Sequence, residues 1–169
     1  FVWSSAPQSN PHSPGLVFRL SLGHERKDVY RAILEGVALE VKKSIEVFKQ
    51  IGMEPKELKL TGGGSRSALW NQIMADVLGV TCVRNVIEEA TSLGAAILAA
   101  SGAGIFPDIA EAADKLCKVE NKYIPSEEKH QFYGKLYDFS YDIYNSLERN
   151  NLFKDFNNFF ESTSEENSQ

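Results

Sequence analysis

The chain has 169 residues, a net charge of −5 at pH 7 and a hydrophobic fraction of 43%. This length and composition suit one domain with a core of ordinary size. An acidic chain without clustered lysine and arginine lacks the charge that nucleic-acid binding requires, so we expect no nucleic-acid partner. No apolar run approaches the roughly 20 residues that a membrane-spanning helix needs, so we expect no membrane segment.

Residues 1–14 have the composition of a connector, because prolines, serines and asparagines are frequent in them, as they are in loops. The chain begins at Phe1 with an apolar stretch and without Met. We therefore expect a fragment of a longer protein, with 1–14 as a connector. The N-terminus has neither the basic region nor the long apolar region of a secretory leader, and we expect a cytoplasmic protein.

The two cysteines, Cys82 and Cys117, lie far apart in the sequence. No second cysteine or histidine stands beside either of them at the spacing of metal ligands. We therefore expect two reduced thiols, with no disulfide framework and no metal site in this chain.

After the connector, the sequence predicts a strand and then the longest helix. Apolar and polar residues alternate over residues 16–22, which favours a strand. Over residues 28–50, apolar side chains recur at helical spacing, and Arg31 stands four residues before Glu35, where the two can pair. Gly52 marks the end of this helix.

A second strand and helix follow, separated by a turn. Residues 58–60 alternate between apolar and polar side chains, the period of a strand. Apolar residues at helical spacing then continue to Leu78. Ser65 or Ser67 can cap the N-terminus of that helix.

Three consecutive glycines, Gly62, Gly63 and Gly64, lie between that strand and that helix. Without side chains, they can take positive φ and let a ligand approach the backbone closely. Backbone N–H groups in such a turn, with the following helix N-terminus, can hold a phosphate. The competing interpretation is a turn with no binding role, because glycine motifs match by chance often.

The two common nucleotide motifs do not fit this turn. Gly62, Gly64 and Ser67 occupy the three glycine positions of the dinucleotide fingerprint, so the third position is not glycine, which disfavours a dehydrogenase. The phosphate loop that ends in Gly-Lys-Ser/Thr is absent. A nucleotide site here is therefore of a third kind.

The remaining segments alternate between strands and helices up to residue 147. The pattern predicts a strand at 80–83, helices at 91–103 and 107–116, an extended segment at 118–124 and a helix from 125 onwards. Glu88 and Glu89 oppose the positive end of the helix at 91–103, and we assign them no catalytic role. This alternation predicts a layered α/β domain with a thin sheet.

The end of the chain, residues 151–169, differs in composition. Its first part contains four phenylalanines and predicts one short amphipathic helix. From Glu161 onward, the residues are mostly Ser, Glu, Thr and Asn, a composition that predicts a disordered tail.

Three phrases resemble the FGGY family of carbohydrate kinases. Residues 31–38 are similar to the helix that opens the family's second domain. Residues 61–79 resemble the family's nucleotide-binding turn and helix, in the form usual for its xylulokinases. Residues 89–100 resemble the small-residue helix that follows. The order and spacing of the phrases also agree, and the resemblance predicts an FGGY C-terminal ATP-binding domain over residues 15–150.

The resemblance implies an α/β fold of the actin-like, ribonuclease-H-like ATPase class, with a small mixed sheet flanked by helices. It also implies ATP and Mg²⁺ as cofactors, and transfer of the γ-phosphoryl group of ATP to a sugar hydroxyl in the full-length protein. D-xylulose is the expected sugar, although gluconate, ribulose and autoinducer sugar kinases share much of the pattern.

Carried over by position, the resemblance implies six ATP-binding residues: Gly62, Gly63, Gly64, Ser65, Ser67 and Asn71. The family's catalytic aspartate and most of its sugar contacts belong to the first domain, which this chain lacks. We therefore expect no catalytic residue here, and no sugar phosphorylation by this chain alone.

Other interpretations remain open beside the kinase. One is a non-catalytic actin-fold module that binds a nucleotide or a partner protein. Another is a different actin-fold ATPase, in which the phrase at 31–38 is not expected. If the face that would meet the missing domain is apolar and exposed, a homodimer is also possible.

Overall fold

The computed structural model describes residue 10 and residues 12–166. Most of the predicted connector 1–14 and the last three residues of the tail lie outside the described residues. The chain forms two compact units, each treated separately below. One unit combines residues before Pro55 with residues after Glu127, and the other runs from Pro55 to Glu127 without interruption.

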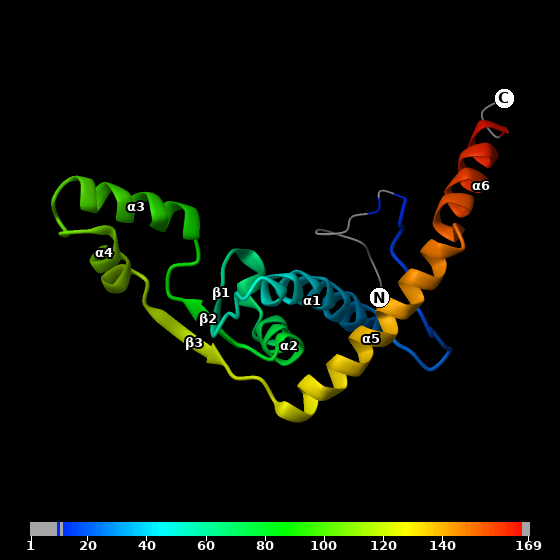
Figure 1. Cartoon of the computed structure of the whole chain (residues 1–169), viewed down its shortest axis with the longest axis horizontal. Helices are drawn as coiled ribbons and strands as arrows, with labels where there is room; N and C mark the ends of the chain where they lie inside the picture. Colours follow the sequence, from blue (N-terminus) through cyan, green and yellow to red (C-terminus); the bar gives the residue numbers. More distant parts are fainter. Residues whose placement is uncertain (1–9, 11, 167–169) are drawn as a thin grey trace. The chain divides into compact units, whose positions relative to one another are not determined.

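The discontinuous unit is built from three helices (Figure 1): α1 Arg26–Gln50, α5 Glu127–Arg149 and α6 Leu152–Glu166. A capping box begins α1, since Glu25 and Asp28 exchange side-chain and backbone hydrogen bonds. The helices predicted at residues 28–50 and from residue 125 onwards are confirmed by α1 and α5. In α6, the helix continues to Glu166, beyond Glu161 where we expected disorder to begin.

Polar and aromatic side chains join α1 to α5. Tyr133, which is 3% exposed, donates its hydroxyl hydrogen to Glu35 Oε1 at 2.8 Å. Arg31 Nε donates to the same oxygen at 2.8 Å, so the predicted Arg31–Glu35 pair forms and is extended across to α5. Further along, the buried Lys43 ammonium lies 5.6 Å from the Tyr144 ring centroid, a cation–π contact.

The strand predicted over residues 16–22 is wrong. Only Leu16 makes an isolated bridge there, and Arg19 has φ of 66°, which breaks the extended conformation. Phe18, Leu20 and Leu22 remain 57%, 63% and 108% exposed. Although these apolar residues alternate as in a strand, no sheet covers the face that they would share, among the residues that the structure describes.

The continuous unit contains a three-stranded mixed sheet with the order β1-β2-β3 (Figure 1). Its strands are β1 Glu57–Leu60, β2 Thr81–Asn85 and β3 Val119–Tyr123, parallel between β1 and β2 and antiparallel between β2 and β3. Helix α2, Ala68–Leu78, packs against β2. The largest fully buried apolar side chains there are Ile73, Val77, Cys82 and Val83.

Two further helices of this unit form a small core of their own. They are α3, Ala90–Gly102, and α4, Ile109–Leu116. Leu93, Ile97 and Ala112 are buried between them. The predicted positions of all these strands and helices agree with the structure to within a few residues.

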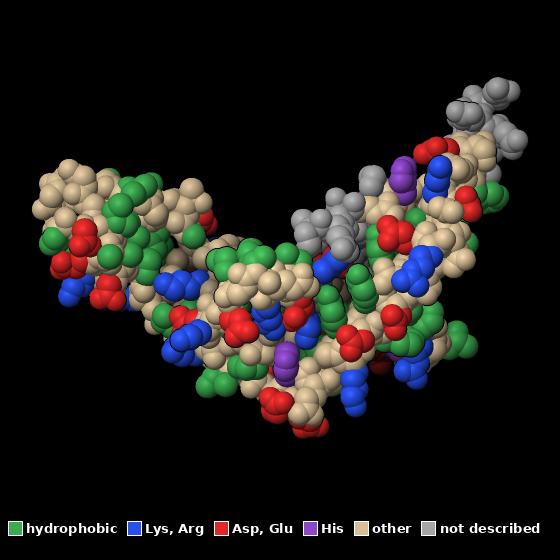
Figure 2. All heavy atoms as spheres, viewed as in Figure 1, with side chains coloured by type: hydrophobic (Ala, Val, Ile, Leu, Met, Phe, Trp, Pro, Cys, Tyr) green, Lys and Arg blue, Asp and Glu red, His purple; other side chains and the backbone are tan. Residues whose placement is uncertain are grey.

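The surface of the chain carries both signs of charge. On the face drawn in Figure 2, basic and acidic side chains are interspersed along α5. Among the described residues, no helix is long and apolar enough to cross a membrane.

Replacing Tyr133 with Phe tests the contact between α1 and α5. The change removes the donor to Glu35 and keeps the ring, so we expect the free energy of unfolding at pH 7 to fall by about 1 kcal/mol. Burial raises the pKa of Tyr133 to about 12 from its ordinary 10.0. The wild type therefore loses stability as the pH rises from 10 towards 12, because the unfolded phenol ionises first, and Tyr133→Phe should show a shallower loss. Urea denaturation across this pH range measures both effects.

Tyr141→Phe is the matched control, because Tyr141 lies on the same helix and its side chain is 38% exposed. It should leave stability at pH 7 within a few tenths of a kcal/mol of the wild type. Equal losses in the two variants would contradict the assigned role of the Tyr133 hydroxyl.

Candidate functional site

The glycine turn connects β1 to α2 and adopts a defined conformation. Gly62 has φ of 76° and ψ of −177°, a region that is essentially restricted to glycine. Gly63 and Gly64 open a short 3₁₀ helix, η1 Gly63–Arg66, and their φ values are not positive. Of the three glycines, only Gly62 is therefore required by the backbone conformation.

Gly63 and Gly64 have a different significance, because both are exposed. A Cβ atom added to Gly63 would have no neighbour within 4 Å, and one added to Gly64 would lie 3.5 Å from Trp70 Nε1. Side chains could therefore be accommodated at both positions. Their absence leaves a bare main-chain surface at the turn.

Two hydrogen bonds to one carbonyl oxygen close the turn. Ser65 N–H donates to Gly62 O at 3.0 Å, and Ser65 Oγ donates to the same oxygen at 2.7 Å. Ser65 is 2% exposed. Its hydroxyl is thus engaged inside the turn.

Asn71 supports the turn from α2. It is 0% exposed, and its Nδ2 donates to Ser65 O at 2.7 Å. Its Oδ1 is buried and has no hydrogen-bond partner among the described residues. The amide group of Asn71 therefore lies beneath the turn and fixes the position of Ser65.

Of the two serines that the sequence offers as the N-cap of α2, Ser67 takes that position. Its Oγ accepts a hydrogen bond from Trp70 N–H at 3.2 Å. Ser67 is exposed. A hydroxyl that accepts one hydrogen bond keeps its hydrogen as a donor, so Ser67 can still donate to a ligand.

The six predicted residues are thus gathered in one turn and the helix that follows it. Gly63, Gly64 and Ser67 are accessible on its outside. Ser65 and Asn71 lie inside it, and Gly62 sets the bend. What the arrangement offers chemically is bare main chain beside the N-terminus of an 11-residue helix, a place suited to an anionic group.

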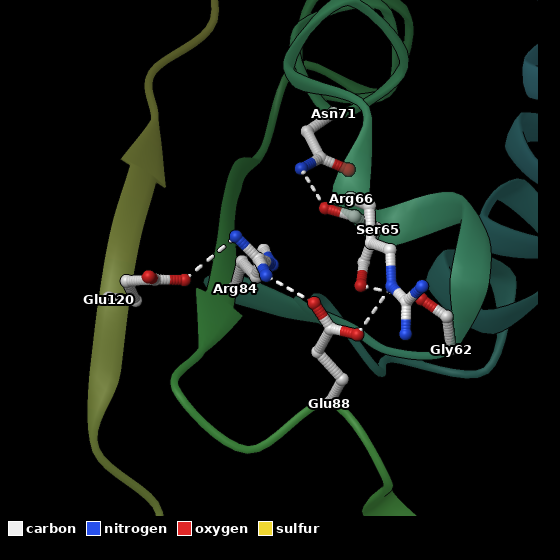
Figure 3. Close-up of polar contacts among 7 residues, drawn as sticks. All are labelled: Gly62, Ser65, Arg66, Asn71, Arg84, Glu88 and Glu120. Carbon is white, nitrogen blue, oxygen red and sulfur yellow. Dashed lines mark hydrogen bonds and ion pairs between the residues drawn. The ribbon is translucent and has the colours of Figure 1, made fainter.

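A chain of ion pairs begins at this turn, and the sequence did not predict it (Figure 3). Arg66 Nε lies 2.6 Å from Glu88 Oε2. The other Glu88 oxygen pairs with Arg84 Nη2, and Arg84 Nη1 lies 2.8 Å from Glu120 Oε2. The network joins η1 to β2, β3 and the loop before α3. Arg66 and Glu88 are 22 residues apart, so no local spacing signals the pair.

Glu88 is bonded to the turn through its main chain as well. Gly62 N–H donates to Glu88 O at 3.4 Å. Hydrogen bonds from Arg66 and then Arg84 hold the pKa of the Glu88 carboxyl below its ordinary value. Glu88 is therefore ionised at neutral pH and paired with two arginines, whereas we expected it only to oppose the positive end of α3.

Asp76 is a buried carboxylate in α2 with a structural role. Its Oδ1 accepts hydrogen bonds from Gln72 Nε2 and from Ser126 N–H, both at 2.9 Å. Gln72 also donates to Ile124 O at 3.0 Å, which ties α2 to the segment after β3. Across the described part of the chain, no three His, Cys, Asp or Glu side chains gather in a way that could hold a metal ion.

Comparisons with known proteins agree on one family. The model of the FGGY family of carbohydrate kinases, C-terminal domain, matches residues 2–103. The chain belongs to this family. It is 33% identical over 138 residues to a xylulose kinase of Staphylococcus epidermidis, covering 82% of this chain and 28% of that protein. It is 36% identical over 134 residues to a glycerol kinase of Saccharolobus islandicus, covering 78% of this chain and 26% of that protein.

Solved structures of FGGY kinases share the fold. Xylulose kinase from Rhodospirillum rubrum matches with a TM-score of 0.70 and 32% identity over 80% of this chain and 27% of that one. Xylulose kinase from Lactobacillus acidophilus matches with a TM-score of 0.73 and 23% identity over 85% of this chain and 29% of that one. The predicted α/β fold of the actin-like ATPase class, with a small mixed sheet flanked by helices, is therefore confirmed. The chain spans less than a third of the length of these relatives.

Alanine substitutions at two adjacent glycines test the turn. Gly62→Ala should lower the free energy of unfolding by about 1–3 kcal/mol, because alanine is strained at this φ and ψ. Gly63→Ala should leave stability unchanged or raise it by up to about 1 kcal/mol, since the space is open and the unfolded chain loses freedom. Chemical denaturation of both variants beside the wild type provides the measurement. A larger loss for Gly63→Ala than for Gly62→Ala would be inconsistent with the turn described here.

Proposed function

We propose that this chain is the ATP-binding part of a sugar kinase, with the nucleotide's phosphates and ribose placed against the glycine turn. The observation that carries the proposal is the exposed main chain of Gly63 and Gly64, in a turn fixed from within, in a member of the FGGY family. The turn lies within residues 15–150, which we propose as the ATP-binding domain.

The six residues take two roles in this proposal. Gly63, Gly64 and Ser67 contact the nucleotide, through backbone N–H groups and the Ser67 hydroxyl. Gly62, Ser65 and Asn71 hold the turn in the conformation that presents those donors. Preorganised donors need no rearrangement when the ligand arrives, which favours binding.

The reaction proposed for the full-length protein is transfer of the γ-phosphoryl group of ATP to a sugar hydroxyl. Such transfer depends on positioning and on neutralising charge around the phosphoryl group. We nominate no catalytic base in this chain, because Asp76 is buried and accepts two hydrogen bonds within its own unit. Mg²⁺ would enter with the phosphates of ATP, since it commonly binds through substrate phosphates and few protein carboxylates.

D-xylulose is the sugar we propose, on the basis of the resemblance of residues 61–79 and the xylulose kinases among the relatives. Sugar contacts are assigned mainly to a missing N-terminal domain, and this chain alone is proposed to be inactive. A cytoplasmic location is part of the same proposal. The non-catalytic alternative, a module that binds nucleotide without a kinase partner, shares the nucleotide site and differs in having no such domain.

Titrating the chain with MgATP while following backbone amide resonances tests the nucleotide site. We expect the largest shifts over residues 61–71, and no turnover when D-xylulose is added. Shifts confined to other parts of the chain would place the nucleotide elsewhere. Phosphorylation of D-xylulose by this chain alone would refute the proposed division of labour.

Gly63→Ala provides the companion test, because it places a methyl group on the bare surface without straining the fold. We expect the Kd for ATP to rise about tenfold, a change of about 1.4 kcal/mol. Gly94→Ala is the matched control, since Gly94 lies in α3 and a Cβ there would also meet nothing within 4 Å. Calorimetric titration should give a wild-type Kd for the control, and equal affinities for all three proteins would exclude close approach at Gly63.

A further inference from the structure

Arg66 is the last residue of η1 and stands three residues after Gly63. In a 3₁₀ helix, residues i and i+3 lie directly above one another, so the Arg66 side chain projects from the same face as the bare surface at Gly63. The Arg66 side chain is 69% exposed. A flexible cation is therefore placed next to the surface at which we locate the phosphates.

The contact that Arg66 makes leaves much of its guanidinium available. Its ion pair with Glu88 runs through Nε. Within the described residues, neither Nη1 nor Nη2 of Arg66 has a hydrogen-bond or ion-pair partner. The two Nη groups are the paired donors that match the oxygens of a phosphate.

The ion pair between Arg66 and Glu88 can be exchanged at low cost. The Arg66 side chain is 69% exposed and that of Glu88 is 19% exposed, and an ion pair whose cation is open to solvent contributes little to stability. If Arg66 left, the Glu88 carboxylate would keep its pair with Arg84. The Glu88 carboxylate would therefore not be left without a partner, which is the usual penalty for breaking an ion pair.

Arg84 is the other cation of the network and is placed differently. Its side chain is 20% exposed, and its two terminal nitrogens pair with Glu88 and Glu120. These contacts hold Arg84 on β2 in a fixed position. It acts as the permanent partner of Glu88, while Arg66 is the exposed partner.

We propose that Arg66 is a phosphate ligand of the nucleotide site, held by Glu88 until a nucleotide arrives and then transferred to the nucleotide's phosphate oxygens. This inference rests on the proposed function, because it requires the phosphates to lie at the glycine turn. It adds a specific ligand, and a competing carboxylate, that the position of the glycines does not imply. No bond is formed or broken in the exchange apart from hydrogen bonds and ion pairs.

The exchange predicts opposite effects for the two partners. Arg66→Met keeps the apolar stem of the side chain and removes the charged guanidinium, and the Kd for ATP should rise about tenfold, as expected when a hydrogen bond to a charged group is lost. The Kd for adenosine, which has no phosphate, should not change. Glu88→Gln removes the competing charge, so the Kd for ATP should fall several-fold.

Glu89→Gln is the control for Glu88→Gln. It removes the same charge from the adjacent residue, and Glu89 makes no side-chain cap bond to α3. The general attraction of ATP to a less acidic surface is therefore the same in the two variants. A larger gain in affinity for Glu88→Gln than for Glu89→Gln supports release of Arg66, and equal gains contradict it.

Calorimetric titration of the wild type and these variants with ATP and with adenosine gives all the values, and thermal unfolding midpoints verify that each variant is folded. An unchanged Kd for ATP in Arg66→Met overturns the inference. So does weaker ATP binding in Glu88→Gln, which would mean that Glu88 only positions the turn. If the wild type binds ATP with shifts at residues 61–71 and Arg66→Met binds equally well, this inference alone fails. If the wild type does not bind ATP, the proposed function fails with it.

Discussion

The carbonyl oxygen of Gly62 is the point on which the candidate site depends. It accepts both the main-chain and the side-chain hydrogen of Ser65, and it can point that way because Gly62 adopts a backbone conformation closed to other residues. Asn71 Nδ2 donates to the carbonyl oxygen of Ser65 from beneath the turn. The buried Nδ2 of Asn71 finds its acceptor in the turn, and the turn is fixed by that donor, so each supports the other. With Ser65 and Asn71 engaged inside the turn, the main chain of Gly63 and Gly64 is left bare on its outer surface.

The helices could be predicted from sequence because their signals are local. Apolar residues recur at helical spacing over residues 28–50, and Gly52 is the stop signal that follows. Helix α1 ends at Gln50, in agreement with both signals. The strand at residues 16–22 could not be judged in this way. A strand needs neighbours for its hydrogen bonds and for its apolar face, and the alternation of Phe18, Leu20 and Leu22 contains no information about whether a sheet is there to receive them. Arg19 then takes a left-handed conformation that propensity does not favour for arginine.

In the candidate site, too, features with local sequence signals could be predicted, and features that depend on the tertiary fold could not. The three glycines and the capping serine stand in the sequence at intervals that local geometry explains, and they lie together in the structure. The internal role of Ser65 and the complete burial of Asn71 depend on how the turn folds back on α2, which residue types do not specify. The network of Arg66, Glu88, Arg84 and Glu120 needs the register of β2 against β3 and the path of the loop before α3. Neither can be obtained from the spacing of charges along the chain.

The discontinuous unit has a consequence for how the chain folds as it is synthesised. Helix α1 leaves the ribosome before the continuous unit, while Tyr133, which bonds Glu35 on α1, is made only after the whole of that unit. The sheet with α2, α3 and α4 can therefore fold while α1 still exposes the side that α5 will cover. During that interval, the apolar residues of α1 are uncovered, and apolar surface exposed in this way favours association between nascent chains.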